Sequence, residues 1–355
     1  GGGGNAVNHM FKEGIHDVTF VLCNTDNQAL AESPVPVKLQ LGRSITEGLG
    51  AGNRPDRAKD AAEESIEEIK DLLNDGTKMV FITAGMGGGT GTGAAPVVAR
   101  LAKEMGLLSV GVVTMPFAFE GNRKKKTAME GITKMQSQMD ALISVENDNL
   151  LKLPENRRMT MVKAFACADG ILKQAINCVA ELILTTGVIN VDFADVTTIF
   201  TQSEASDALL GIGCAEDAQK AVEQAVQSPL LDKSLKGARG VILNLTGDET
   251  MSLLDVDNAT RYICEQTDPN VNIILGTVID EQMKGQVQAT IIATDFAGST
   301  AIKAPKLEVP QSKLQKPQHF SLDAPSFMKK PDQAEKPGAF AIPAFRIAPE
   351  NGEKK

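Results

Sequence analysis

Tryptophan is absent from this chain of 355 residues, and tyrosine occurs only once. The 13 phenylalanines supply nearly all of the aromatic side chains, so the core must rest mainly on aliphatic residues and methionine. The five cysteines form no CxxC pair and no ligand cluster with histidine. An odd number of cysteines without regular spacing indicates reduced thiols in a cytoplasmic protein, and no metal site of the protein's own is expected.

Long apolar runs and concentrated positive charge are also lacking. The sequence has no signal peptide and no apolar stretch long enough to cross a bilayer, so direct membrane insertion is not expected. The net charge is -9. Residues 304–355 hold nine Lys and Arg against six Asp and Glu, a charge of +3, which leaves -12 on the rest. An acidic body argues against nucleic acid as a partner.

The chain has no initiator methionine and starts with four glycines, Gly1 to Gly4. This beginning predicts a fragment that starts inside a loop, with a preceding strand missing.

Strands and helices alternate in the first half of the sequence. Short apolar runs predict strands at Val18–Leu22, Met79–Thr83, Ser109–Thr114 and Ala141–Val145, with helices such as Ala58–Leu73 and Ala94–Met105 between them. This alternation is typical of a parallel sheet covered by helices. Ligands of such sheets bind at the carboxyl ends of the strands.

A long helix and a second α/β domain are expected to follow. Apolar residues recur at three- and four-residue steps from about Met159 to Thr185, long enough to run between two domains. The second domain is predicted from helices near Ala215–Gln227 and Met251–Glu265 and strands at Gly240–Leu245, Val271–Val278 and Val287–Ala293. Eight of the 16 prolines lie from Pro305 to Pro349, a composition typical of a flexible linker.

The strongest signal for chemistry is Gly87-Gly88-Gly89-Thr90-Gly91-Thr92-Gly93, between a predicted strand and a predicted helix. Glycines allow the backbone to approach an anion, and the free amides and dipole of a helix start favour phosphate. A tight structural turn is the alternative, but turns seldom need five glycines in seven residues. The run is neither a P-loop, because GxxxxGK[ST] is absent, nor the GxGxxG dinucleotide motif.

This run resembles the signature of the tubulin/FtsZ family of GTPases, and the resemblance extends over about Gly1 to Phe296. Five further segments resemble the family's nucleotide loops in the same order: Gly1–Asn8, Asn24–Asp26, Gly48–Gly52, Thr114–Gly121 and Asn147–Asp148. The resemblance implies a tubulin-like fold with a Rossmann-like parallel-sheet GTPase domain, a long central helix, a smaller C-terminal α/β domain and a disordered tail. It implies GTP binding, Mg²⁺ held mainly through the GTP phosphates, and hydrolysis activated by self-assembly.

The predicted division of the chain follows from both arguments. It comprises a GTP-binding domain (1–158), a central helix (159–186), a C-terminal α/β domain (187–303), a linker (304–338) and a partner-binding peptide (339–355). The residues expected around GTP are Gly1, Gly2, Gly3, Gly4, Asn5, Asn24, Asp26, Ala51, Gly52, Gly88, Gly89, Thr90, Gly91, Glu120, Lys124, Asn147, Phe165 and Asp169.

Guanine recognition can be argued from the long helix. Phe165 and Asp169 are four residues apart and share a face, so a ring and a carboxylate lie together. The carboxylate suits the paired N1–H and N2–H donors of guanine, which adenine lacks. A core phenylalanine and a solvated aspartate are the blander alternative, and the resemblance favours guanine. The family's sugar-contacting Arg falls on Lys124, beside Arg123, and Lys offers a point charge rather than a planar fork.

Asp192 and Asp195 lie three residues apart at a predicted helix start, where acidic residues commonly serve as caps. The segment Asn190–Val196 resembles the family's loop that enters the nucleotide pocket of a neighbouring subunit. The resemblance implies that the two aspartates orient and polarise the attacking water and that Asn190 reaches the γ-phosphate. Hydrolysis needs positioning and charge stabilisation more than covalent help.

The expected function is that of a GTPase that polymerises head to tail into the cytokinetic ring at the bacterial division site, in the cytoplasm at midcell. The segment Ile342–Arg346 resembles the family's terminal peptide, which docks on membrane anchors and regulators. Two other classes of protein fit the sequence less well. A filament or adaptor protein without hydrolysis is disfavoured by the aspartate pair, and a Rossmann-type oxidoreductase is disfavoured by the missing GxGxxG.

Overall fold

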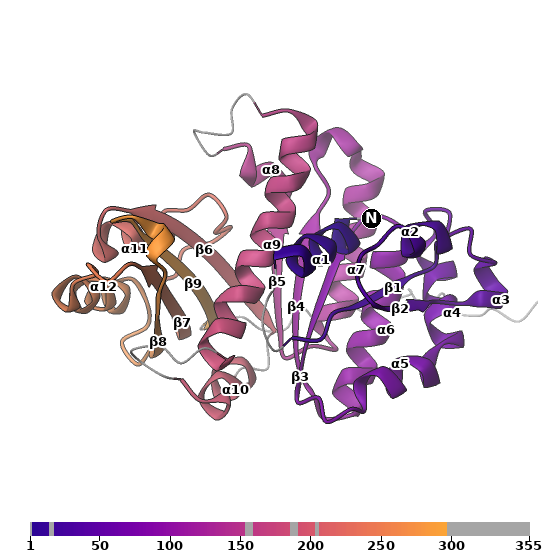
Figure 1. Ribbon diagram of the computed structural model, residues 1–355, viewed down its shortest axis with the longest axis horizontal. Helices are drawn as coiled ribbons and strands as arrows, with labels where there is room; N and C mark the ends of the chain where they lie inside the picture. The colour runs from indigo at the N-terminus through magenta and orange to yellow at the C-terminus, as the bar shows by residue number, and fades with distance from the viewer. Residues whose placement is uncertain (1, 14–17, 153–158, 185–190, 203–205, 297–355) are drawn as a thin grey trace, which may run out of the picture. The chain divides into compact units, whose positions relative to one another are not determined.

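The computed structural model describes residues 2–13, 18–152, 159–184, 191–202 and 206–296 (Figure 1). Its helices are α1 (Gly2–Glu13), α2 (Asn27–Ala31), α3 (Arg43–Thr46), α4 (Pro55–Glu64), α5 (Ile66–Leu73), α6 (Thr90–Glu104), α7 (Asn122–Gln136), α8 (Asn147–Leu150), α9 (Met161–Leu184), α10 (Phe193–Thr201), α11 (Ala218–Val226) and α12 (Leu253–Gln266). Its strands are β1 (Val21–Asn24), β2 (Val37–Gln40), β3 (Met79–Gly85), β4 (Leu108–Met115), β5 (Ala141–Glu146), β6 (Asp207–Ala215), β7 (Ala238–Gly247), β8 (Asn272–Ile279) and β9 (Val287–Phe296).

Seven strands form one sheet in the order β3-β4-β5-β6-β9-β7-β8. The first four are parallel, and β9 is antiparallel to both of its neighbours. The strands β3, β4 and β5 belong to the GTPase domain, and β6, β9, β7 and β8 belong to the smaller C-terminal sheet domain. The two halves are joined by the short pairing of Leu142 with Asp207 and Ile143 with Ala208. The strands β1 and β2 form a separate parallel pair.

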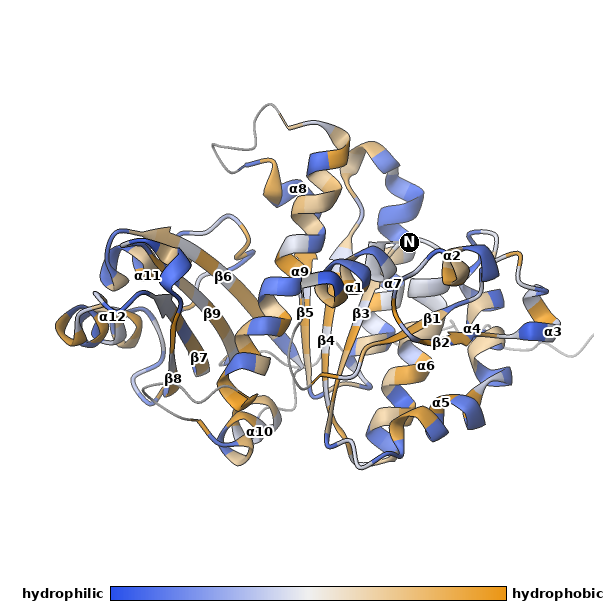
Figure 2. Ribbon diagram, viewed as in Figure 1, coloured by the Kyte–Doolittle hydropathy of each residue, from blue (hydrophilic) through white to orange (hydrophobic). Residues whose placement is uncertain are grey.

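Both faces of the parallel half are buried, as the predicted alternation requires. On β4, Val110 and Val112 pack in the same apolar cluster as α1 and α9. Val113 and Met115 point to the other face, where they pack with residues of α6 and α7. Figure 2 shows the resulting apolar colouring of the central strands. A sheet buried on both faces reads as a continuous apolar run, which explains why β4 was recognisable from sequence.

The long helix α9 confirms the prediction of a helix from about 159 to 185. Its buried residues include Ala168, Leu172, Ala175 and Val179, which follow the expected three- and four-residue steps. It contacts β4 of the parallel half as well as β8 and β9 of the C-terminal half. The helix therefore packs against both parts of the sheet.

The expectation that the chain begins in a loop was wrong, because it is helical from Gly2. Ala6, Val7 and Met10 are buried at helical spacing, which gives α1 an apolar face against the sheet. Gly3 permits the contact: a Cβ on it would stand 2.8 Å from Ala84 Cα of β3. Gly3 thus serves close packing in a helix and not a free loop.

Three further expectations about local structure need correction. The single helix expected at Ala58–Leu73 is two helices that meet at Ser65, whose φ of -100° and ψ of 19° leave the helical region. The first strand begins at Val21 instead of Val18. The strand β6 was missed because its glycines resemble a turn; a Cβ on Gly211 or Gly213 would collide with the backbone of α11.

Candidate nucleotide site

The glycine run begins after the carboxyl end of β3 and continues into the first turn of α6, which starts at Thr90 and not at the expected Ala94. Gly87 has a φ of 94°, which favours glycine, and its N–H donates to Thr92 Oγ1 at 2.9 Å. Gly89 precedes the first residue of α6 and provides no side-chain cap, so the first amides of this 15-residue helix remain available. This is the arrangement that binds phosphate at helix starts.

Two other predicted loops pack against the glycine run. A Cβ on Gly89 would stand 2.9 Å from Ala51 Cβ and 3.1 Å from the Arg54 amide nitrogen, so these loops touch backbone to backbone. Thr25 is fully buried, and its hydroxyl lies 2.7 Å from the Thr90 hydroxyl. Its carbonyl accepts from Gly50 N at 3.0 Å. The structure therefore brings residues 24–26, 48–52 and 87–91 together.

Asp26 is already engaged by its own backbone in this arrangement. Its Oδ1 accepts from the amides of Gln28 at 2.9 Å and Ala29 at 3.3 Å, as the N-cap of α2. Asn24 Oδ1 accepts in turn from the Asp26 amide at 3.2 Å. The observed role of both side chains is to shape the loop beside Thr25.

An aromatic cluster stands at the carboxyl end of β4. Phe117 stacks on Phe119 with ring centroids 5.1 Å apart, and Phe165 of α9 meets Phe117 edge to face at 5.3 Å. Phe117 is buried, whereas Phe119 and Phe165 are 59% and 39% exposed. The two exposed rings offer flat apolar surface of the kind on which a base stacks.

The next loop of the sheet is tied to this cluster. Asp148 Oδ1 accepts from the Ala118 amide at 2.9 Å. Beside it, Asn147 begins α8 and is only 4% exposed, yet its Oδ1 has no hydrogen-bond partner. A buried acceptor without a partner is costly, and a bound group that donates to it would remove that cost.

Asp169 lies four residues beyond Phe165 on α9 and is partly buried. Burial raises the pKa of its carboxyl to about 6, and an electrostatic interaction with His9 on α1 opposes this rise. Burial disfavours the charged form because the carboxylate loses water. A ligand with N–H donors for this carboxylate would restore the lost interactions.

Glu120 and Lys124 form an ion pair near the aromatic cluster. Lys124 Nζ donates to Glu120 Oε2 at 3.0 Å, while Glu120 Oε1 accepts from the Phe117 amide at 3.0 Å. The backbone here also touches the glycine run, since a Cβ on Gly87 would lie 2.9 Å from the Lys124 carbonyl oxygen. Arg123 is exposed to solvent.

The predicted catalytic aspartates lie at the opposite end of the parallel strands. Asp192 caps α10, and its Oδ1 accepts from the Asp195 amide at 2.8 Å. Phe193 lines a pocket with Lys78 and Leu108, at the amino ends of β3 and β4. The glycine run follows the carboxyl end of the seven-residue β3, so roughly 20 Å of strand separates the two groups. One copy of the chain does not bring them together (Figure 1).

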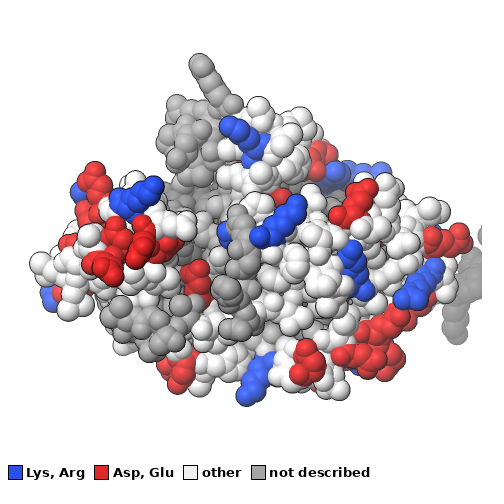
Figure 3. Space-filling model, viewed as in Figure 1, with Lys and Arg blue, Asp and Glu red and all other residues white. Residues whose placement is uncertain are grey.

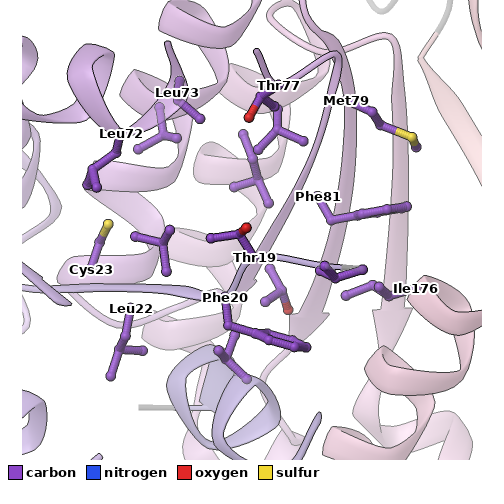
Figure 4. A pocket seen from close by; sticks show the side chains of 18 of the residues that line it. Thr19, Phe20, Leu22, Cys23, Leu72, Leu73, Thr77, Met79, Phe81 and Ile176 are labelled. Carbon is purple, nitrogen blue, oxygen red and sulfur yellow. The ribbon is translucent and has the colours of Figure 1, made fainter. Parts of the chain in front are cut away.

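An apolar cavity of about 650 Å³ runs along the outer edge of β3 (Figure 4). Phe20, Leu22, Phe81 and Ile176 line it, and it reaches Thr90 at the end near the glycine run. Its wall is mostly hydrocarbon, so it offers few partners to a phosphate. The phosphate candidate is therefore the glycine run itself.

Charge is distributed unevenly over the surface. On the face drawn in Figure 3, acidic side chains gather over α5, which carries Glu67 and Glu68 in its first turn. Within the described ranges, no three His, Cys, Asp or Glu residues are grouped to hold a metal ion. No helix in the same part of the chain is long and apolar enough to cross a membrane.

Several predicted site residues contact one another, and others lie outside the described residues. Gly1, Asn190 and the segment Ile342–Arg346 lie outside the described residues. Gly2, Gly4 and Asn5 are on α1, with Asn5 exposed. Two hydrogen bonds were not predicted, the one between the hydroxyls of Thr25 and Thr90 and the one from the Ala118 amide to Asp148. Neither contact follows from the spacing of residues in the sequence.

Comparisons with known proteins agree with this geometry. Residues 1–155 match the GTPase domain of the tubulin/FtsZ family, and residues 206–297 match the C-terminal domain of the FtsZ family. A structure of an empty FtsZ dimer from M. jannaschii has a TM-score of 0.78 and 39% identity, over 83% of this chain and 85% of that one. A structure of a tryptophan-to-tyrosine mutant of M. jannaschii FtsZ has the same score and identity, over 82% and 88%.

A more distant structure has the same fold. CetZ2 from Haloferax volcanii, in a GTPγS-bound protofilament, has a TM-score of 0.70 at 19% identity, over 85% of this chain and 91% of that one. At 39% identity over most of both chains, the M. jannaschii comparison establishes kinship beyond the fold. The chain belongs to the FtsZ family, within the tubulin/FtsZ group of GTPases.

Proposed function

We propose that this GTPase acts at a site completed by the next copy of the chain in a head-to-tail filament. The observation that carries the proposal is the separation of Thr90 and Asp192, which lie at opposite ends of β3. Stacking two copies end to end would bring the aspartates of one to the glycine run of the other. Such a contact joins two different surfaces, so it repeats without closing and builds an open filament.

Within this proposal the residues of one copy bind GTP. The amides of Gly88 to Gly91 at the start of α6 hold the phosphates, and Ala51 packs against Gly89 beside them. Asp169 accepts from guanine N1–H and N2–H, and Phe165 stacks on the base. The unpartnered oxygen of Asn147 supports a donor from the ligand at that point. Glu120, whose Oε1 also accepts from the Phe117 amide, would accept from the ribose hydroxyls.

The neighbouring copy supplies the groups that act on water. Asp192 and Asp195 orient the attacking water and polarise it. Asn190 lies outside the described residues, and its action on the γ-phosphate is proposed from the family resemblance alone. In hydrolysis of this kind the protein contributes position and electrostatic stabilisation.

Mg²⁺ is proposed to bind mainly through the GTP phosphates, where it would supply positive charge to the phosphate oxygens. Mg²⁺ usually retains several waters and needs few protein ligands. The donor set beside the glycine run fits this chemistry, because the hydroxyls of Thr25 and Thr90 lie there.

The cellular role proposed for the filament is the cytokinetic ring of a bacterium, in the cytoplasm at midcell. Family membership supports cell division, and the composition of residues 304–338 supports a linker. The peptide around Ile342–Arg346 would dock on membrane-anchored partners at the end of that linker.

A filament protein that binds GTP without hydrolysing it is the second candidate. One observation favours it: the Asp192 carboxylate already serves as a helix cap. GTP turnover and light scattering, measured together over a range of protein concentrations, separate the two. The proposed function predicts that turnover per subunit rises sharply where scattering begins. Scattering with no turnover would support the second candidate.

A further inference from the structure

The carboxylate of Glu120 is held from two sides. Its Oε1 accepts from the Phe117 amide at 3.0 Å, which fixes the turn around η1 (Ala118–Glu120). Its Oε2 accepts from Lys124 Nζ at 3.0 Å, one turn along the chain. A carboxylate oxygen can accept two hydrogen bonds, so each of these oxygens retains capacity for one more. Both oxygens are thus oriented by the protein while they can still accept from a ligand.

The surroundings distinguish this pair from a pair on an open surface. The Glu120 side chain is only 18% exposed, and that of Lys124 is 39% exposed. The backbone of Lys124 abuts Gly87, so its position is fixed relative to the glycine run. Arg123, the neighbouring cation, is exposed. Lys124 is therefore the cation whose side chain turns back toward Glu120.

We infer that Lys124 contacts neither the phosphates nor the sugar of the nucleotide but is a positioning residue, which aims the Glu120 carboxylate at the ribose hydroxyls. This inference rests on the proposed function, because it assumes that guanine nucleotide occupies the site. The ammonium group restrains one carboxylate oxygen, and a charged acceptor makes stronger hydrogen bonds with neutral hydroxyl donors. The sequence suggested a direct contact from Lys124 or Arg123, and the ion pair favours an indirect one.

A comparison of two ligands separates the indirect role from a phosphate contact. The probes are GDP and 2′,3′-dideoxy-GDP, which carry the same phosphates but differ in the ribose hydroxyls. Equilibrium dialysis with GDP avoids hydrolysis during the measurement. We expect Lys124→Met to weaken GDP by about tenfold, the size of one hydrogen bond to a charged group. The dideoxy ligand should bind the variant and the original protein alike.

Controls show whether the effect passes through Glu120. Lys124→Arg should restore GDP affinity, because it keeps a cation within reach of the carboxylate. Arg123→Met removes one positive charge from the adjacent position and should weaken neither ligand. Glu120→Gln should lose the preference for GDP over the dideoxy ligand. Adding Lys124→Met to Glu120→Gln should not lower GDP affinity further. Independent residues would instead give additive losses.

Three results would overturn the inference. Equal weakening of GDP and dideoxy-GDP by Lys124→Met would show a direct phosphate contact. No weakening of either ligand would show that the ion pair does not matter for binding. Failure of the original protein to bind GDP would defeat the proposed function and this inference together, and that result is distinguishable from the other two.

Discussion

Asp192 and Asp195 are linked at the start of α10, where the Asp192 carboxylate accepts from the Asp195 amide at 2.8 Å. The link makes Asp192 an N-cap, and both carboxyl groups are exposed. A cap alone would account for an acidic residue at this position. Substitution can separate a capping role of Asp192 from a catalytic role, because asparagine caps helices about as well as aspartate but has no carboxylate.

The first prediction uses this difference. Asp192→Asn should leave the thermal unfolding midpoint unchanged, whereas Asp192→Ala should cost about 1 kcal/mol of stability. Both variants should lose GTP turnover by about 10²-fold or more, since a group that positions water is removed. Steady-state phosphate release and thermal unfolding provide the two readouts. Full turnover by Asp192→Asn would show that Asp192 is only a cap.

The second prediction concerns Asp169 and pH. Its pKa is raised to about 6, so the carboxyl is protonated below that pH and does not accept from guanine. Affinity for GDP should therefore be constant well above pH 6 and fall as pH is lowered through 6, by up to about tenfold per unit. Asp169→Asn should bind weakly at every pH. Titration of both proteins with GDP from pH 5 to pH 8 measures this difference, and an identical pH profile in the variant would contradict it.

The Asp169 carboxyl affects folding stability in the opposite direction: nucleotide affinity should fall as pH is lowered, whereas the stability of the unliganded protein should fall as pH is raised. Its folded-state pKa lies above the unfolded value, so its contribution is most favourable below the unfolded pKa of 3.8 and is lost as pH rises through about 6. At pH 7 and without nucleotide, Asp169→Asn should therefore be more stable by about 1 kcal/mol, after allowance for solvent screening. Denaturant unfolding without nucleotide measures the change. An equal or lower stability for the variant would be inconsistent with the raised pKa.

The third prediction concerns Gly89. A Cβ there would meet Ala51 Cβ at 2.9 Å and the Arg54 amide at 3.1 Å, so Gly89→Ala must push the two loops apart. We expect GDP affinity to fall by at least about tenfold, because binding to the amides depends on their alignment. Gly76→Ala is a matched control, since a Cβ there has no atom within 4 Å. It should affect stability through its φ of 92° but leave nucleotide affinity unchanged.

Some helices and strands of this molecule could be predicted from the sequence, and others could not. The helix α9 and the strand β4 were predictable because each has one strong apolar period along its length. The strand β6 was not, because Gly211 and Gly213 are required by the close backbone of α11 and not by their own neighbours in sequence. The start of α1 was misjudged for the same reason at Gly3. A glycine in a sequence does not show whether it serves a turn or a close contact.

Some residues of the candidate site could also be predicted from the sequence, whereas several of its contacts could not. The glycine run and the pair Phe165 and Asp169 were identifiable from local spacing and family resemblance. The contacts of Thr25 with Thr90 and of Asp148 with Ala118 join residues 65 and 30 positions apart, so no spacing rule shows them. The distance between the aspartates of α10 and the glycine run could not be predicted from the sequence, because it depends on where α10 packs relative to β3 in the fold.

The fourth prediction concerns the C-terminal segment. Removal of residues 304–355 should leave GTP hydrolysis and filament formation largely intact, because its composition cannot form a packed core. It should abolish recruitment to membrane-anchored partners. Phosphate release and light scattering test the first part, and cosedimentation with anchor-bearing vesicles tests the second. Loss of hydrolysis in the shortened protein would show that the segment contributes to the catalytic unit.

The fifth prediction tests the central claim, that one active site is shared by two copies. Asp195→Ala keeps the nucleotide pocket but should hydrolyse GTP poorly, whereas Asp169→Ala keeps the aspartates of α10 but should bind GTP poorly. In a mixed filament, the α10 end of the second variant meets the pocket of the first. Random co-assembly of equal amounts would make about one interface in four complete.

The decisive measurement is GTP turnover by the equimolar mixture, with co-assembly verified by cosedimentation of differently labelled variants. The shared site predicts that the mixture hydrolyses GTP well above the sum of the two variants alone. Verified co-assembly with no gain in turnover would contradict it.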